Sequence, residues 1–451
     1  MILFLVLLAT VLIGGKLLDI LGYRGEWYEK WSLAFLLSSA LQTLGYFIIL
    51  GSGVNANSLT YYVFLGTTLL LLQLISKIKR GLPTPQITLA PSSQTRLARN
   101  STKIIWLGIF TLFAITAIYT TYLPVYTTDS IILYDFRAKV IAATGNLNSI
   151  NIVPDWAAYP MFTSMIHLFA RLLGYTNPSL FYPLMYLAFA GVFYGAIRPK
   201  LSQFKSSLLT LLMYSTPITL WQSKLDGMTN LPYAIFYAIA IIYLEKYWKN
   251  DKSVWQYAII SALFLGFASW TRHTEPFWAI PIFLVILSII FKRQILIPII
   301  YLGIFWFIRR IWPSYTHADY MSVVGATQSI VSNAIISSAN TSYHLINTFQ
   351  IALEFVWRSF NLGLNPLLYL FFISSLIDLS LKSLKSQLFY LFIVFGNILL
   401  LYISVIFAIN TFSYWSGLDN SFTRMLSYIA PLLWLYISNS SIWYRIDEWG
   451  K

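Results

Sequence analysis

The sequence predicts an all-α polytopic membrane protein. Hydrophobic residues make up 58% of the 451-residue chain, aromatic residues 18% and charged residues only 10%. A soluble globular domain carries about 25% charged residues, and aromatic rings concentrate at membrane–water interfaces. The net charge of +14 is then a topology signal, so nucleic acid is not expected as a partner. The chain contains no cysteine, which excludes disulfides, thiolate metal sites and cysteine nucleophiles.

Hydropathy predicts about thirteen transmembrane helices, since about 20 apolar residues cross a bilayer. The first apolar segment lacks a basic start and a small-residue cleavage site, so we expect a retained helix rather than a signal peptide. The predicted helices lie near residues 1–22, 31–51, 60–77, 104–124, 179–197, 206–222, 229–245, 254–270, 276–291, 295–312, 364–380, 387–409 and 424–442.

Composition divides the chain into five predicted segments. The prolines of residues 78–103 indicate a cytoplasmic linker between N-terminal transmembrane helices and the rest of the chain. The predicted segments are 1–77 (N-terminal helices), 78–103 (linker), 104–312 (a core with an external loop at 125–178), 313–363 (second external loop) and 364–451 (C-terminal transmembrane module). The second external loop is either a lid or acceptor-binding element, or a flexible excursion.

The loops differ in charge. With thirteen spans, most of the 30 basic residues fall on one side, which the positive-inside rule assigns to the cytoplasm. The N-terminus is then outside and the C-terminus cytoplasmic. The four histidines and half of the 16 acidic residues fall on the other side or at its edge, so we expect any chemistry on the external face.

The first external loop contains a predicted short helix. Asp129 or Thr128 would cap its start, and Gly145 would end it. The helix is too short to span a membrane, so we expect it to lie in the membrane plane with an apolar stripe in the headgroups. That stripe comprises Ile131, Tyr134, Ala138 and Ile141.

Several polar residues of this loop are candidates for chemistry. Asp135 and Lys139 are four residues apart and can pair. Asp129 is either a helix cap or a general base or metal ligand, and an acidic residue held against a membrane is costly enough to suggest function.

Residues 159–174 predict a second in-plane or re-entrant helix. Asp155 before it is either structural or a second carboxylate of the site, and His167 is expected to be a satisfied interfacial histidine.

Two arginines lie at predicted external helix ends. Arg272 belongs to the segment TRHTE with His273 and Glu275, and three ionisable residues between apolar helices need mutual pairing or water. Arg272 and Arg424 either snorkel to the interface or bind phosphate, for which the planar guanidinium is well suited.

Four segments in this order resemble the GT-C superfamily of polyprenyl-phosphate-dependent glycosyltransferases. The similarity is to an uncharacterised bacterial branch, distantly related to protein O-mannosyltransferases and aminoarabinose transferases. In this branch the first external loop reads roughly DALSYWDLKAKILY. The matching segments are TDSIILYDFRAKVIAATG, KLDGMTNLPYAIFYAIAIIYLEK, SWTRHTEPFWAI and LDNSFTRMLSYIAPLLW.

The resemblance implies a GT-C-type fold in a bacterial plasma membrane. It further implies inverting transfer of a sugar from a polyprenyl-phosphate donor to a glycan, lipid or protein acceptor on the external face. Asp129 would be the base or a metal ligand, with Asp135 as a second catalytic candidate and Asp155 as a further ligand of a divalent metal (Mg²⁺ or Mn²⁺). The candidates for binding substrate or phosphate are Arg137, Lys139, Asp226, Arg272, His273, Glu275 and Arg424.

Two other functions compete. A glycan polymerase or ligase of the O-antigen type would centre its site on the large late loop. A lipid or sugar transporter would carry charged residues in mid-helix along a pathway. Loss of the Asp129 carboxylate separates the classes, because transport should survive it and sugar transfer should not.

Overall fold

The computed structural model describes residues 2–79, 96–123, 125, 127–150, 159–224, 228–249, 255–316, 349–350, 353–359, 361, 366–380, 384–411 and 424–443. Within these ranges the secondary structure is helical, with no strand. The first half contains α1 (Ile2–Leu21), α2 (Trp27–Gly51), α3 (Ser58–Lys79), α4 (Arg96–Tyr122), η1 (Ser130–Asp135), α5 (Phe136–Thr144), η2 (Leu147–Ser149), α6 (Phe162–Leu172), α7 (Phe181–Ile197), α8 (Gln203–Tyr214) and α9 (Pro217–Lys224).

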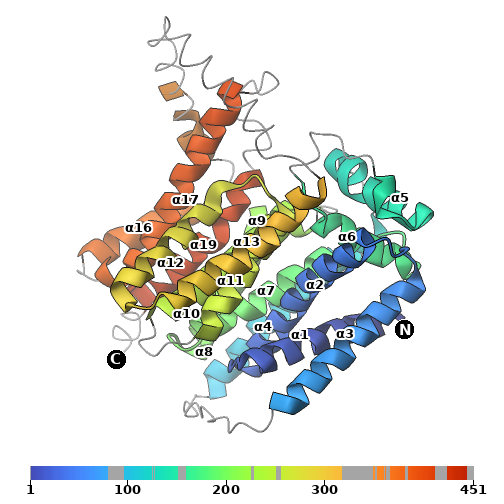
Figure 1. Ribbon diagram of the computed structural model, residues 1–451. Coiled ribbons are helices and arrows are strands. Elements are labelled where there is room, and N and C mark those ends of the chain that lie inside the picture. The colour runs from blue at the N-terminus through green and yellow to red at the C-terminus, as the bar shows by residue number, and fades with distance from the viewer. Residues whose placement is uncertain are drawn as a thin grey trace, which may run out of the picture.

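The second half contains α10 (Asn230–Lys249), α11 (Trp255–Thr271), η4 (Pro276–Trp278), α12 (Ala279–Lys292), α13 (Leu296–Thr316), α16 (Leu367–Ser380), α17 (Leu384–Thr411), η7 (Leu426–Tyr428) and α19 (Ala430–Asn439). The long helices run side by side, while α5 and α6 are short and lie at one end of the bundle (Figure 1).

The helices α1, α2, α3, α4, α13 and α17 contain six segments long and apolar enough to cross a bilayer, and α7, α12 and α16 are shorter apolar helices. Large apolar side chains such as Leu70 and Ile118 are more than half exposed on these helices, as expected where lipid is the solvent. The protein is therefore a helical membrane protein. The count of thirteen spans and the GT-C fold stay predictions.

The packed interior is built around α10. Nearly every residue of this helix is buried, and its neighbours include α11 and α7. Small residues allow other helices to approach closely. A Cβ atom on Gly14 of α1 would lie 1.9 Å from the carbonyl oxygen of Ala34 in α2, so these two backbones are in direct contact.

The bundle has two distinct ends. At one end, the Ala56 amide donates to the Gly145 carbonyl at 2.7 Å, close to the short helices. At the other end lysines meet buried glutamates, with Lys200 at 2.9 Å from Glu245 and Lys246 at 2.5 Å from Glu29. We call the first the Asp129 end, because Asp129 directly precedes the short helix η1, and the second the basic end.

One predicted span is interrupted. Residues 206–222 form α8 and α9 rather than one helix, because the chain leaves helical geometry at Ser215 and Thr216. Pro217 explains the break, since a proline disfavours helical geometry in the residue before it.

Candidate functional site

Asp129 and Arg424 form an ion pair at the Asp129 end. The Asp129 Oδ2 atom lies 2.9 Å from Nη1 of Arg424. The Asp129 side chain is 48% exposed and that of Arg424 is 29% exposed, so both groups are open to a ligand. Asp129 makes no capping hydrogen bond to η1, and the predicted cap at this residue is wrong, because its side chain turns to the arginine instead.

The start of α10 joins Arg424 to Arg272. Arg424 Nη1 lies 3.3 Å from the sulfur of Met228. Arg272 donates from Nη1 to Asn230 Oδ1 at 2.9 Å, and Thr229 Oγ1 lies at the 3.5 Å limit. Both guanidinium groups therefore lie beside the start of α10, in contact with the consecutive residues Met228, Thr229 and Asn230.

Arg272 is enclosed by acidic and aromatic groups. Its Nε atom lies 2.7 Å from Glu275 Oε1, and its side chain is only 12% exposed. The rings of Tyr159 and Tyr428 lie 5.5 and 6.0 Å from the guanidinium carbon, within the range of cation–π attraction. The buried cation is thus compensated on several sides.

Two tyrosine hydroxyls complete this cluster. Tyr428 donates to Asn230 Oδ1 at 2.8 Å, and the hydroxyls of Tyr134 and Thr229 lie 3.2 Å apart. Burial raises the pKa of Tyr134 well above the usual range, so this hydroxyl stays protonated and can donate a hydrogen bond.

His273 lies within electrostatic reach of two arginines of α13. Its side chain is buried, and burial, followed by the charges of Arg309 and Arg310, lowers its pKa to about 3. The ring is therefore neutral near pH 7. A neutral imidazole can still donate one hydrogen bond, so the predicted role of His273 in binding substrate or phosphate stays a prediction.

Asp135 belongs to a second, buried cluster. Its carboxylate lies 2.9 Å from Lys139, 2.5 Å from Arg171 and 3.4 Å from His167 Nδ1. Burial raises its pKa, but the hydrogen bonds of His167, Arg171 and Lys139 outweigh that effect and hold the pKa well below its usual range. The predicted pair of Asp135 with Lys139 is confirmed.

This second cluster connects α5 to α6. Asp135 and His167 are almost fully buried, and His167 Nε2 lies 3.0 Å from the Tyr182 hydroxyl. His167 is satisfied, as predicted, although it lies in the protein interior. With three partners and little exposure, the Asp135 carboxylate is positioned for structure, and its surroundings do not support the predicted catalytic role.

Arg137 and Lys139 face different surroundings. Arg137 is fully buried, donates to the Tyr159 carbonyl at 2.7 Å, and lies over the Trp312 ring. Burial lowers its pKa to about 10, so it is still charged near pH 7. Arg137 thereby holds in place Tyr159, whose ring lies over Arg272. Lys139, in contrast, is 55% exposed.

The predicted helix at 129–145 is present, but most of its apolar stripe is turned into the protein. It ends at Gly145 with φ of +70°, as expected for a left-handed glycine at a helix end. Of the four residues of the predicted stripe, Tyr134, Ala138 and Ile141 are buried inside the protein instead of lying in lipid headgroups, and Ile131 is exposed. The predicted second short helix at 159–174 is α6, and the glycine that ends it, Gly174, has φ of +83°.

Asp155 and Asp226 lie outside the described residues. Within the described part of the chain, no group of three or more His, Asp or Glu residues could hold a metal ion, and the partner that Asp129 shows is a guanidinium. Sequence reasoning missed Thr229, Asn230 and Tyr428. The polar pair at the start of the apolar α10 was the available signal for the first two.

The class of protein defined by the fold is a helical membrane protein. The chain matches no family model, no curated protein and no solved structure. Its function is therefore inferred from its own residues and their geometry.

Proposed function

We propose that the protein is an integral membrane glycosyltransferase that moves a sugar, with inversion, from a polyprenyl-phosphate donor to a glycan, lipid or protein acceptor. One observation carries the proposal: the exposed carboxylate of Asp129 is paired with Arg424, beside the aromatic-walled Arg272, at one end of a membrane helix bundle. Inverting transfer from a lipid phosphate needs a base and cations at headgroup depth.

The proposed reaction uses Asp129 as the base. Its carboxylate takes the proton from the acceptor hydroxyl as that oxygen attacks the anomeric carbon. The bond between this carbon and the phosphate oxygen breaks, and the phosphate leaves with the electron pair. The half-exposed position of Asp129 supports this role, because a base must reach the proton it removes.

The leaving phosphate is assigned to Arg424. Its guanidinium is more exposed than that of Arg272, and guanidinium groups bind phosphate through paired hydrogen bonds. Arg272 is held by Glu275 and Asn230, so its proposed role is to add positive potential and to position the start of α10. Asp135 is left out of the reaction.

These steps use protein groups alone. A divalent metal, Mg²⁺ or Mn²⁺, would need ligands besides Asp129, and the predicted second ligand Asp155 lies outside the described residues.

The proposed location is a bacterial plasma membrane with the Asp129 end outside. Lys200, Lys246 and Lys249 gather at the opposite end, and lysine-rich ends face the cytoplasm. The predicted orientation, with the N-terminus outside and the C-terminus inside, agrees with this arrangement.

The test is sugar transfer by purified protein from a panel of radiolabelled polyprenyl-phosphate sugars, with Asp129→Asn beside the wild type. Asp19→Asn is the matched control, because Asp19 forms an ion pair with Lys30 and is 44% exposed. We expect transfer by the wild type and by Asp19→Asn but not by folded Asp129→Asn. Transfer unaffected by Asp129→Asn would move the site elsewhere and favour the polymerase or ligase. Unchanged lipid or sugar uptake into vesicles, without transfer, would favour the transporter.

A further inference from the structure

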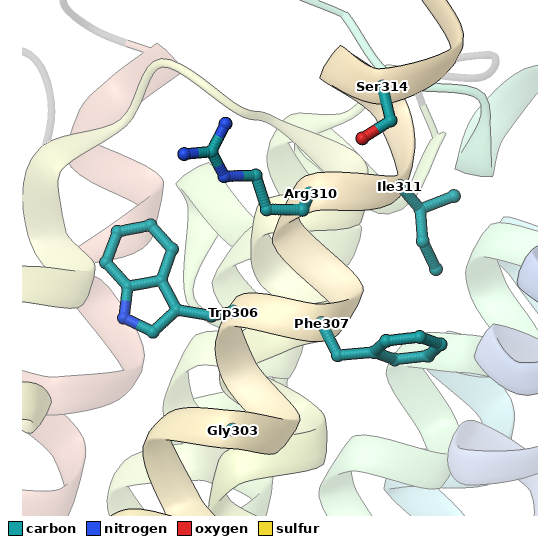
Figure 2. Close-up of a pocket in the computed structure, with 6 residues that line it drawn as sticks. All are labelled: Gly303, Trp306, Phe307, Arg310, Ile311 and Ser314. Carbon is teal, nitrogen blue, oxygen red and sulfur yellow. The ribbon is translucent and has the colours of Figure 1, made fainter.

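An open, shallow groove of about 590 Å³ lies along the surface of α13, and neither Asp129 nor Arg424 lines it. All of its lining residues belong to α13: Gly303, Trp306, Phe307, Arg310, Ile311 and Ser314. Figure 2 shows Trp306 and Arg310 extending to one side of α13, and Phe307 and Ile311 to the other. The groove is therefore apolar along most of its length, with one guanidinium near its upper end.

The groove lies on a helix that is long and apolar enough to cross a bilayer. Trp306 is 42% exposed and Phe307 is 65% exposed, so both rings face the surrounding lipid. The medium that covers this surface is therefore a bilayer, whose lipids supply the apolar chains that such a groove fits.

Besides an apolar surface, a lipid-binding groove needs a group that binds the lipid headgroup, and Arg310 provides a cationic one. It lies six residues before Thr316, the last residue of α13, which places its Cα about 9 Å from that helix end. Its side chain is exposed, and no ion pair or hydrogen bond joins it to another described residue. The neighbouring Arg309 is instead buried, with Ser269 and the Trp278 ring as partners. An exposed guanidinium on a lipid-facing helix is costly without an anion.

We propose that this groove binds a bilayer phospholipid with an anionic headgroup, such as phosphatidylglycerol. Arg310 binds the phosphate, and an acyl chain lies along Trp306, Phe307 and the open surface at Gly303. This site is independent of the proposed sugar transfer, because none of its lining residues belongs to the Asp129–Arg424 site.

A substitution at Gly303 tests the apolar part of the groove and leaves Arg310 unchanged. A Cβ atom on Gly303 would have no other atom within 4 Å, and the same holds for Gly66 on α3. Gly303→Leu would therefore fill the groove without a clash, while Gly66→Leu adds the same side chain to a different lipid-facing helix. Arg293 is exposed after α12, so Arg293→Gln is the matched control for Arg310→Gln.

The experiment measures lipid bound to the full-length protein by native mass spectrometry, after purification from nanodiscs of phosphatidylglycerol or phosphatidylcholine. We expect selective retention of phosphatidylglycerol, weakened about tenfold by Arg310→Gln and reduced by Gly303→Leu, with both controls unchanged. Folding is checked by gel filtration. Equal retention of both lipids, or equal loss in Arg310→Gln and Arg293→Gln, would overturn the site. Displacement of the phospholipid by equimolar undecaprenyl phosphate would also overturn it, by assigning the groove to the polyprenyl lipid.

Discussion

Arg424 reaches Asp129 at 2.9 Å across 295 residues of sequence. Asp129 precedes η1 in the first predicted external loop, whereas Arg424 precedes η7 near the end of the chain. Two short polar segments from opposite halves of the protein thus share one ion pair, and this pair is the basis of the proposed chemistry.

The first prediction separates catalysis from stability at this pair. Because Asp129 is half exposed, the pair contributes at most about 1 kcal/mol to folding. Arg424→Gln should therefore leave the melting temperature in detergent nearly unchanged, yet lower the sugar-transfer rate about 100-fold, as expected for loss of one charge-stabilising group. Arg293→Gln is the control. A large drop in melting temperature with proportional loss of activity would show a structural role instead.

The second prediction concerns Arg272 and Glu275, which are both nearly buried. Arg272→Met alone leaves a buried carboxylate without its cation and should cost about 3–5 kcal/mol of stability. The double substitution Arg272→Met with Glu275→Leu should recover most of that loss, since it removes both charges. Sugar transfer by the folded double variant should stay reduced, because the positive potential of Arg272 is gone. Recovery of full activity would confine Arg272 to a structural role.

The third prediction follows from the lowered pKa of His273. Folded His273 takes up a proton only near pH 3, whereas the unfolded residue does so near pH 6.5. Between these values the unfolded chain binds more protons, so stability falls as the pH falls, by at most about 1.4 kcal/mol per pH unit. His273→Gln should flatten the decline in melting temperature between pH 7 and pH 5. The same slope in both proteins would contradict the burial of this ring.

The fourth prediction tests the contact of α1 with α2. Gly14→Val forces a side chain into the backbone of Ala34 and should destabilise the protein by about 1–3 kcal/mol. Gly66→Val, in an open position on α3, should change the melting temperature little. Equal effects of the two substitutions would show that helix propensity, rather than packing, sets the cost.

The sequence could predict those features that depend on local pattern. Apolar runs marked the helices, Gly145 marked the end of α5, and the four-residue spacing paired Asp135 with Lys139. Arg171 and His167 were not linked to Asp135, because they come from α6 and no spacing connects them. The long-range contact of Arg424 with Asp129 was inaccessible for the same reason.

The orientation of the short apolar stripe could not be read from its composition. Tyr134, Ala138 and Ile141 satisfy a helical period that fits lipid and protein interior equally, since both are apolar. In a soluble protein the same pattern would have pointed inward without ambiguity. Tyr428 was overlooked because a single polar residue at a helix start carries no distinctive spacing.

The position of Arg424 near the end of the chain has a consequence for synthesis. A growing chain presents Asp129 to the membrane long before the ribosome reaches the segment that carries Arg424 and Tyr428, and segments emerge in order from the N-terminus. Nascent chains that have not yet reached this segment therefore hold an incomplete cluster, which is assembled only when Arg424 and Tyr428 have been made.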